Sequence, residues 1–299
     1  MTTKNKTVTY EGKSSTGKRV AGTHLTLSQL GNISRADVTA ENKATARYYW
    51  ERRLANRKFD SWYGTLQGKT IDDARKYVTE GWREGADKAL SFVSDIYAKC
   101  TLPEPKDVRR KQVWSDDGDE LDYDKLMGGE LDTMYRTTKR EGKGQTPHCS
   151  LIVNWGGLAY VEADDLFWSG AVAIILSDVL ENAGYRVEIV GCNTSQQDGG
   201  VYSATSVAVK ELDEPLRTDI VAGALCEAGV FRTLGFAAKM TANTAIDRGM
   251  GCTDDFTKVA VNSVKGNPFS EDSFVIKQCL SMEDAIAEIN RVCEELDSK

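Results

Sequence analysis

The stretch Ser150–Cys192 decides the fold, because its residues predict a strand, a helix and a second strand in immediate succession. The apolar run Leu151–Val153 predicts the first strand, which breaks at Asn154-Trp155-Gly156-Gly157. A long apolar segment follows, with acidic residues at its start and Asn182-Ala183-Gly184 at its end, which is typical of a helix. The β-rich run Tyr185–Gly191 completes a βαβ unit. Because parallel strands need such a crossover, the C-terminal half is predicted to be α/β.

The residues after this unit predict how the sheet continues. Val201–Lys210 alternates in hydrophobicity and follows the second strand closely, so it is expected to pair with that strand as an antiparallel edge strand. Buried helices come next, then strands at Val259–Val261 and Ser273–Ile276, and an amphipathic helix capped by Ser281. Residues 148–299 are therefore predicted to form one α/β domain.

The first 147 residues predict a mainly helical, basic region with an acidic loop. A polar leader up to Thr23 is expected to be flexible or hairpin-like. Helical patterns cover Ala40–Lys58 and Gly85–Lys99, and Thr70 has an acidic residue three positions later, as in a capping box. Beyond the acidic loop, Leu126–Leu131 is expected to pack a short helix or turn back onto the body.

The composition of the 299 residues is that of a soluble globular protein, with 40% hydrophobic and 28% charged residues. No leader of charged and then apolar residues follows Met1, and the longest apolar run, around Ala171–Leu176, is too short to span a bilayer. The seven cysteines are scattered without a CxxC pair, so they are expected to be reduced and mostly buried. Together these features predict a cytoplasmic protein without membrane contact.

Charge divides unevenly, with a balance of +5 over residues 1–148 and −12 over residues 149–299. The basic half contains an aromatic and arginine-rich segment that could stack on and neutralise a nucleic acid. Its candidate contact residues are Tyr49, Arg52, Arg53, Arg57 and Lys58. The alternative is that the aromatic rings pack inward and the basic side chains form a solvated face.

Two stretches imitate ligand-binding motifs. Gly12–Lys18 has the spacing of a phosphate-binding P-loop, but Arg19 replaces the required Ser or Thr and no helix start follows. The carboxylates of Trp114–Asp124 do not match the positions of a calcium-binding EF-hand loop in any register, so a solvated acidic loop is favoured. Neither stretch predicts a ligand.

Catalytic patterns are weak as well. His24 and His148 are the two histidines, and neither lies in a recognised motif. Cys149 adjoins His148, but neighbours on a strand point to opposite faces, so a thiol–imidazole pair is not expected. The sequence predicts no catalytic residue, no cofactor and a non-enzymatic role.

The order strand, helix, strand, antiparallel strand, helices, strand and terminal helix resembles a von Willebrand factor A-type domain, a doubly wound α/β fold. Such domains often hold a divalent cation after the first strand through an Asp-x-Ser-x-Ser motif. The matching positions here are Asn154, Gly156 and Leu158. Because side-chain oxygens are lost at two of the three positions, the resemblance implies a degenerate site without metal.

Four short motifs are similar to those of an uncharacterised family of phage and prophage proteins. They are Ser61-Trp62-Tyr63-Gly64, Gly81-Trp82-Arg83-Glu84-Gly85-Ala86, Gly184-Tyr185-Arg186-Val187-Glu188 and Phe231-Arg232-Thr233-Leu234-Gly235-Phe236. The resemblance carries no activity, and it implies a phage or prophage protein in a bacterial host cell.

These observations predict a protein-binding α/β module whose partner remains unidentified. Ligands of open α/β sheets bind beyond the carboxyl ends of the strands. The expected contact residues are Asn154, Trp155, Gly156 and Gly157, which follow the first strand of the βαβ unit. Nucleic-acid binding through the basic aromatic segment is the alternative.

Overall fold

The computed structural model describes residues 8–13, 17, 19–55, 62–100, 110–115, 120–121, 123–129, 133–139, 147–196, 200–241 and 273–297. The expected strand at Val259–Val261 lies outside these residues. All statements below concern the described residues.

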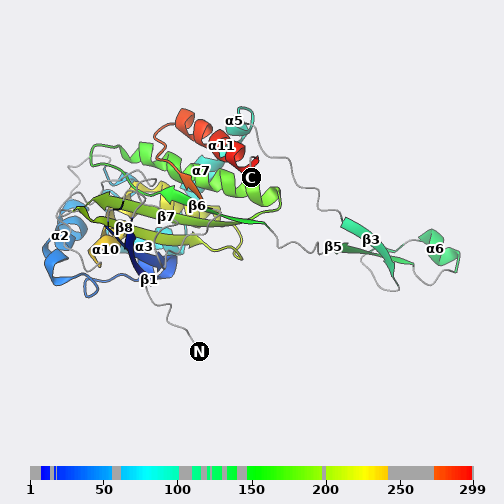
Figure 1. Ribbon diagram of the computed structural model, residues 1–299, viewed down its shortest axis with the longest axis horizontal. Helices are drawn as coiled ribbons and strands as arrows, with labels where there is room; N and C mark the ends of the chain where they lie inside the picture. Colours follow the sequence, from blue (N-terminus) through cyan, green and yellow to red (C-terminus); the bar gives the residue numbers. More distant parts are fainter. Residues whose placement is uncertain are drawn as a thin grey trace.

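A six-stranded mixed sheet in the order β1-β2-β8-β7-β6-β9 forms the centre of the molecule (Figure 1). Its strands are β1 (Val8–Lys13), β2 (Arg19–Thr26), β6 (His148–Asn154), β7 (Arg186–Gln196), β8 (Tyr202–Lys210) and β9 (Ser273–Ile276). The pairs β1/β2 and β7/β8 are antiparallel, whereas β2/β8, β6/β7 and β6/β9 are parallel. The predicted mixed α/β class is confirmed, with helices packed on the sheet.

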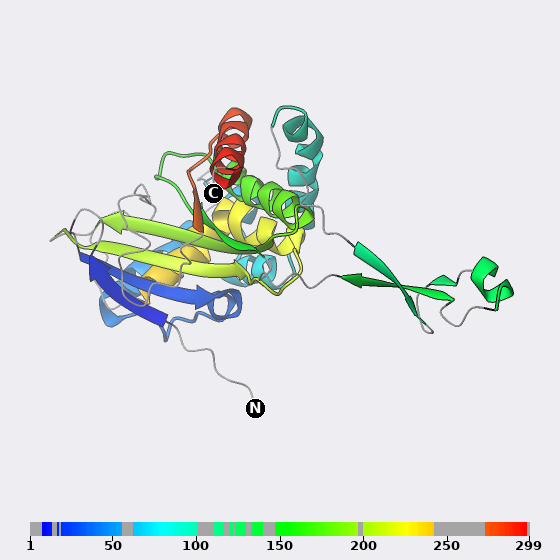
Figure 2. The ribbon, with the colours of Figure 1, turned by 45° about the vertical axis from the view of Figure 1, so that its right-hand side comes forward.

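The predicted βαβ unit is present as β6, α7 (Ala163–Asn182) and β7. Buried residues occur all around α7, which explains why its sequence is a continuous apolar run rather than a narrow stripe. Gly170 allows a close approach, because a Cβ there would collide with the backbone of Leu225. Helix α7 lies along the sheet with α11 beside it (Figures 1 and 2).

The sheet extends further than the sequence predicted. Strand β8 pairs antiparallel with β7 as expected, but it is not an edge strand, because β2 pairs with its other side. The leader forms the β1/β2 hairpin, which was one of its two expected forms. The sheet therefore crosses the boundary that was expected between residues 147 and 148.

The helices of the N-terminal part pack on the same core. They are α1 (Leu27–Gly31), η1 (Ala40–Asn42), α2 (Lys43–Arg47), the π-helical η2 (Tyr48–Arg53), η3 (Gly64–Leu66), α3 (Ile71–Thr79), α4 (Arg83–Ser91) and α5 (Val93–Tyr97). Leu30, Val78 and Ile96 share one buried cluster with Phe167 of α7. The capping box of α3 is confirmed, because the Asp73 amide donates to the Thr70 hydroxyl at 3.3 Å.

The helices of the C-terminal part follow β8 and β9. They are α8 (Thr218–Val221), the π-helical η5 (Ala222–Cys226), α9 (Ala228–Val230), the π-helical η6 (Phe231–Gly235), α10 (Phe236–Met240) and α11 (Met282–Asp297). Ser281 caps α11 as predicted, since its hydroxyl accepts from the Asp284 amide at 3.1 Å. None of the six cysteines in the described part of the chain forms a disulfide, and all but Cys100 are buried.

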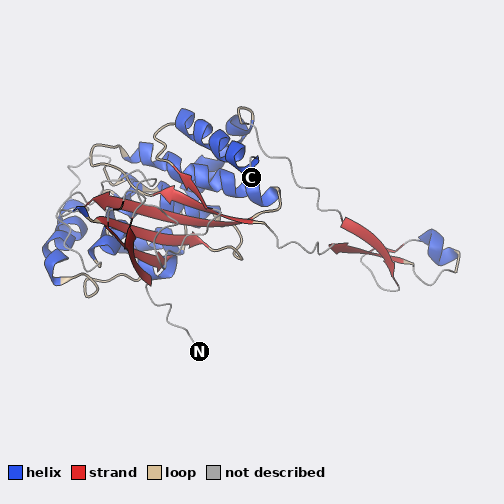
Figure 3. Cartoon of the chain, in the orientation of Figure 1, coloured by secondary structure: helices blue, strands red, loops and turns tan. Residues whose placement is uncertain are grey.

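A separate small sheet projects from this body (Figures 1 and 3). It has the order β3-β5-β4, with β3 (Arg110–Ser115), β5 (Met134–Lys139) and β4 (Glu120–Leu121). Helix α6 (Tyr123–Met127) lies at its far end. We call residues 110–139 the arm. The expected helix or turn at Leu126–Leu131 is matched only in part, because α6 spans Tyr123–Met127 and residues 130 and 131 lie outside the described residues. Helix α6 does not pack on the body.

Among the described helices, none is by itself both long and apolar enough to cross a membrane. One bent pair, Thr218–Cys226 with Ala228–Met240, meets that test by length and composition alone.

Candidate functional site

The predicted contact loop, Asn154–Gly157, follows β6 as expected, but all four residues are buried. The Trp155 ring packs edge-on against Phe231, with 5.3 Å between ring centroids. The Gln278 side chain donates to the Gly156 carbonyl at 2.7 Å. The loop is therefore part of the packed interior and does not form a surface. Tyr160, three residues beyond the loop, is 79% exposed.

Gly156 shows why this loop needs glycine. Its φ of +115° is rarely adopted by other residues, and the Phe231 ring occupies the space of a Cβ. Asn154 Oδ1 is buried and has no hydrogen-bond partner among the residues that the structure describes. The described residues contain no group of three or more His, Cys, Asp or Glu side chains placed to hold a metal ion.

The basic aromatic segment packs Tyr49 and Trp50 against the body, whereas Tyr48 is exposed. The Tyr49 ring lies edge-on to Phe236 at 4.9 Å and stacks on Trp62 at 6.4 Å. Arg52 and Arg53 lie in η2, while Arg57 and Lys58 fall outside the described residues. The inward-packing interpretation is confirmed for Tyr49, which is engaged in an aromatic cluster.

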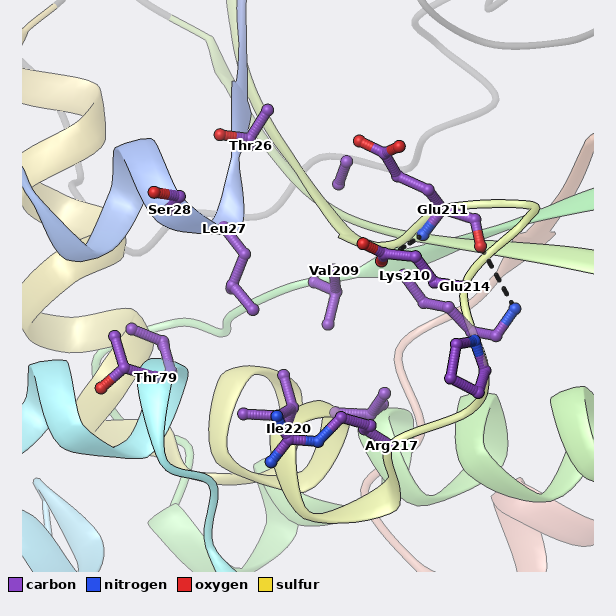
Figure 4. Close-up of a pocket in the computed structure, with 14 residues that line it drawn as sticks. Thr26, Leu27, Ser28, Thr79, Val209, Lys210, Glu211, Glu214, Arg217 and Ile220 are labelled. Atoms are coloured by element: carbon purple, nitrogen blue, oxygen red, sulfur yellow. Dashed lines mark hydrogen bonds between the residues drawn. The ribbon is translucent and has the colours of Figure 1, made fainter. Parts of the chain in front are cut away.

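A cavity of about 430 Å³ lies at the opposite end of the sheet, beyond the carboxyl ends of β2 and β8 (Figure 4). Leu27, Val209 and Ile220 give it an apolar floor, and Glu214 and Arg217 stand at its sides. Sequence reasoning placed the crevice after β6. That reasoning missed this cavity. Strand β8 is antiparallel to β7, and β2 is parallel to β8, so the carboxyl ends of β2 and β8 lie at the end of the sheet opposite to that of β6.

Both cations that line this cavity, Lys210 and Arg217, are paired. The buried Lys210 ammonium contacts Glu181 Oε1 at 2.8 Å and donates to the Val187 carbonyl at 2.6 Å. Arg217 is paired with Asp219 at 2.9 Å. The Glu211 amide donates to Glu214 at 3.2 Å. Lys210 and Arg217 are therefore each paired with a carboxylate, whereas the lining Glu211 and Glu214 carboxylates have no cation at ion-pair distance among the described residues.

A second cavity, of about 340 Å³, contains a different kind of buried charge. It is lined by Gly64, Thr65, Trp82, Lys88, Ala163, Asp164, Phe167, Cys226, Glu227 and Ala228. We call it the Glu227 cavity. It lies where η3, the start of α4, the first turn of α7 and the break between η5 and α9 meet.

Glu227 occupies that helix break in an extended conformation and is only 3% exposed. The Gly229 amide donates to its Oε1 at 3.1 Å, so the side chain caps α9. The Thr65 hydroxyl donates to its Oε2 at 2.9 Å. Within the described residues, no cation lies at ion-pair distance from this carboxyl. Burial raises its pKa to about 7, and the hydrogen bonds from Thr65 and Gly229 oppose that rise.

The arm supplies a third feature, a cluster of exposed apolar side chains on α6. Met127 is 86% exposed, Tyr123 72% and Leu126 48%. We call these three residues the arm tip. Large apolar side chains that stand together outside a core are typical of interaction surfaces.

Comparison with known proteins adds a family but no activity. A domain family of unknown function, DUF7192, matches residues 22–298. The chain belongs to this family. No curated protein and no solved structure matches the chain. The DUF7192 match runs from β2 through the arm to α11, so it includes both sides of the expected domain boundary.

Sequence reasoning did not single out Glu227, although the sequence contains a pattern that could have identified it. Glu227 is a single acidic residue inside the apolar run from Ile220 to Phe236. A lone carboxylate in such a run must be neutralised, hydrogen-bonded or functional. The position of Thr65 beside it could not be read from the sequence, because 162 residues separate the two.

Proposed function

We propose that the protein is a non-enzymatic, protein-binding module in which an A-type-like α/β body carries an arm that docks on a partner. The exposed arm tip is the observation that carries this proposal. Burial of two or three large apolar side chains in a partner's pocket supplies the central energy of many interfaces. The proposed contact residues are therefore Tyr123, Leu126 and Met127, in place of the buried Asn154–Gly157 loop.

The element order supports an A-type-like body. Strand, helix, strand, antiparallel strand, helices, strand and terminal helix occur as β6, α7, β7, β8, α8 to α10, β9 and α11. The β1/β2 hairpin and the arm are additions to that order. The α/β body provides a rigid base for the projecting arm. Asn154 stands where the metal-binding motif has aspartate, so the metal site of the A-type fold is degenerate in this proposal.

The chemistry of the arm indicates the kind of partner. Acidic residues surround the tip in the sequence, at positions 116, 117, 119, 120, 122 and 124. An acidic surround favours a protein whose apolar pocket has a basic rim, because charge complementarity steers association and disfavours other partners. It opposes an anionic membrane surface or a nucleic acid as the occupant.

The proposal is tested by photocrosslinking in the native cell. A photoreactive residue at Met127 is expected to capture one protein, whereas the same residue at the exposed Tyr160 of the body does not. With that protein purified, Tyr123→Ser combined with Met127→Ser should weaken binding at least about tenfold. Tyr160→Ser is the matched control, and rising salt should weaken binding further.

Two results would contradict the proposal. In one, the captured protein binds the double variant as tightly as the parent chain. In the other, the captured molecule is a second copy of this chain and sedimentation shows a dimer that the double variant loses. The second result would replace a heterologous partner by self-association.

Nucleic-acid binding through Tyr49, Arg52, Arg53, Arg57 and Lys58 stays the alternative. It has less support because the Tyr49 ring is held by Trp62 and Phe236. Salt-sensitive RNA or DNA binding that Arg52→Ala with Arg53→Ala weakens would favour it. A phage or prophage origin and a place in the bacterial cytoplasm stay predictions of the sequence.

A further inference from the structure

The cavity beyond the carboxyl ends of β2 and β8 has room and an apolar floor for a ligand. We call it the β2/β8 cavity. Its volume of about 430 Å³ lies in the range of small-molecule sites. Leu27, Val209 and Ile220 lie along its floor (Figure 4). Leu27 is partly exposed and the lining Pro215 is exposed, so part of the apolar lining can be reached from solvent. The cavity can therefore take up the aliphatic part of a ligand.

Two carboxylates on the loop after β8 give the cavity its negative charge. Glu211 and Glu214 line it and are both exposed. Among the described residues, neither carboxylate has a cation at ion-pair distance, whereas Asp213 between them is paired with Arg186 at 2.6 Å. An ionised carboxylate accepts about four hydrogen bonds. The described structure supplies one to Glu214, so capacity remains for the N–H donors of a ligand.

Hydrogen bonds within the loop hold Glu214 in place. The Glu211 amide donates to Glu214 Oε2 at 3.2 Å, and the Glu214 amide donates to the Glu211 carbonyl at 3.2 Å. The same carbonyl accepts from the buried Lys210 ammonium at 3.3 Å, which ties the turn to β8. Figure 4 shows the Glu214 side chain extending toward Val209. A carboxylate that is already positioned lowers the entropic cost of binding.

The cations that line the cavity are engaged elsewhere. The Lys210 side chain is 2% exposed, and its ammonium contacts Glu181 and two backbone carbonyls, which uses its three N–H groups. Arg217 is paired with Asp219 at 2.9 Å. Residues 149–299 carry a net charge of −12, which adds a negative potential around the cavity. The charge distribution therefore favours a cationic ligand over an anionic one.

We propose that the β2/β8 cavity binds an aliphatic primary ammonium group, as in a free alkyl amine or a lysine side chain. The ammonium donates to the carboxylates of Glu211 and Glu214. Its methylene chain packs on the apolar floor formed by Leu27, Val209 and Ile220. The ligand chemistry follows from two carboxylates without a described counter-charge beside an apolar surface. The site goes beyond partner binding by the arm tip and is independent of it.

Calorimetric titration of the full chain at low salt tests the proposal with matched probes. The amine n-pentylamine is expected to bind. The alcohol n-pentanol has the same chain without the charge and should bind at least about tenfold more weakly. Methylamine has the charge without the chain and should also bind at least about tenfold more weakly, because each buried methylene adds affinity. Rising salt should weaken the binding of n-pentylamine.

A further probe identifies the source of the ammonium group. Nα-acetyl-lysine N-methylamide presents the same group on a peptide backbone. Tighter binding of this probe than of n-pentylamine would support the proposal with a lysine side chain as the ligand. Weaker binding would support it with a free amine as the ligand.

Glu214→Gln removes the charge but keeps an oxygen that can accept from the Glu211 amide, so the turn should persist. It should lower n-pentylamine affinity at least about fivefold, and Glu211→Gln added to it should bring the loss to at least about tenfold. Binding of n-pentanol should not change in either variant, which a structural defect would not allow. Asp213→Asn is the matched control, because it removes a charge from the same loop but does not line the cavity.

Three results would overturn the proposal. They are equal affinities for n-pentylamine and n-pentanol, no binding of any amine, and a loss in Asp213→Asn as large as that in Glu214→Gln. Failure here leaves partner binding by the arm tip untouched, because Met127 lies on the arm and not in the cavity. Crosslinking from Met127 tests that function separately.

Discussion

Lys210 and Glu227 are both charged residues buried in the body, and they are satisfied in different ways. The Lys210 ammonium has an anionic partner, Glu181, and two carbonyl acceptors, those of Val187 and Glu211. Glu227 accepts from the Thr65 hydroxyl and from the backbone amides of Thr65 and Gly229, but no described cation lies at ion-pair distance from it. A buried charge with a counter-charge holds the fold, whereas one without it is kept near the balance between its two protonation states.

The largest effect is expected when the satisfied charge is removed. Lys210→Met should lower the free energy of unfolding by about 3 kcal/mol, because Glu181 loses its partner and the Val187 carbonyl loses its donor. Urea denaturation measures this. Glu181→Gln should cost less, since that side chain is partly exposed. Equal and small losses in the two variants would show that the pair contributes little.

The contribution of Glu227 should appear as a pH dependence of the free energy of unfolding. Its pKa is raised from 4.5 to about 7 in the fold, so the folded state holds a proton that the unfolded chain releases. Its stabilising contribution is complete below pH 4.5 and is lost as pH rises through 7, a change of about 3 kcal/mol.

The difference in unfolding free energy between the parent chain and Glu227→Gln isolates this contribution. The parent chain should lose stability relative to the variant between pH 4.5 and 7.5, and the difference should be constant at higher pH. A difference that does not vary with pH would show that the carboxyl titrates normally, and would remove the contrast with Lys210.

Gly64 tests how tightly the carboxyl is enclosed. Its φ is +55°, and a Cβ would collide with Glu227 Oε1. Gly64→Ala should therefore cost about 1–2 kcal/mol in thermal or urea unfolding, from backbone strain and the displaced carboxyl together. Gly184→Ala is the matched control, because Gly184 has a φ of +90° but open space around its Cβ position. If both variants lose the same stability, Glu227 is not confined by Gly64.

Local features of the fold could be predicted from the sequence, whereas features that depend on distant segments could not. Local signals were sufficient for β6, α7 and β7, and for the caps at Thr70 and Ser281, because strand length, hydrophobic period and capping chemistry lie within a few residues. The antiparallel pairing of Val201–Lys210 followed from its closeness to β7. Its other neighbour, β2, lies about 180 residues away in the chain, so no local pattern indicated it.

The candidate sites were harder to predict for a related reason. The Asn154–Gly157 loop was located correctly at the end of β6, but its burial depends on Phe231 and Gln278, which come from distant segments. The cavity beyond β2 and β8 depends on strand directions that only the complete sheet fixes. Two of the arm-tip residues, Leu126 and Met127, lie in the stretch predicted as a short helix or turn that packs on the body, because apolar side chains usually pack inward, and their exposure could not be read from the sequence.

The smallest expected effect concerns Lys69, a cation whose charge lowers the pKa of Glu227. Lys69 is exposed, so its influence on the carboxyl is weakened by solvent. Lys69→Met should raise the pKa of Glu227 slightly further, as followed by NMR titration of its side-chain carbon. Added salt should produce a similar shift in the parent chain and none in the variant. A large shift would mean that Lys69 acts as a true counter-charge. Glu227 would then be a paired buried charge, as Lys210 is.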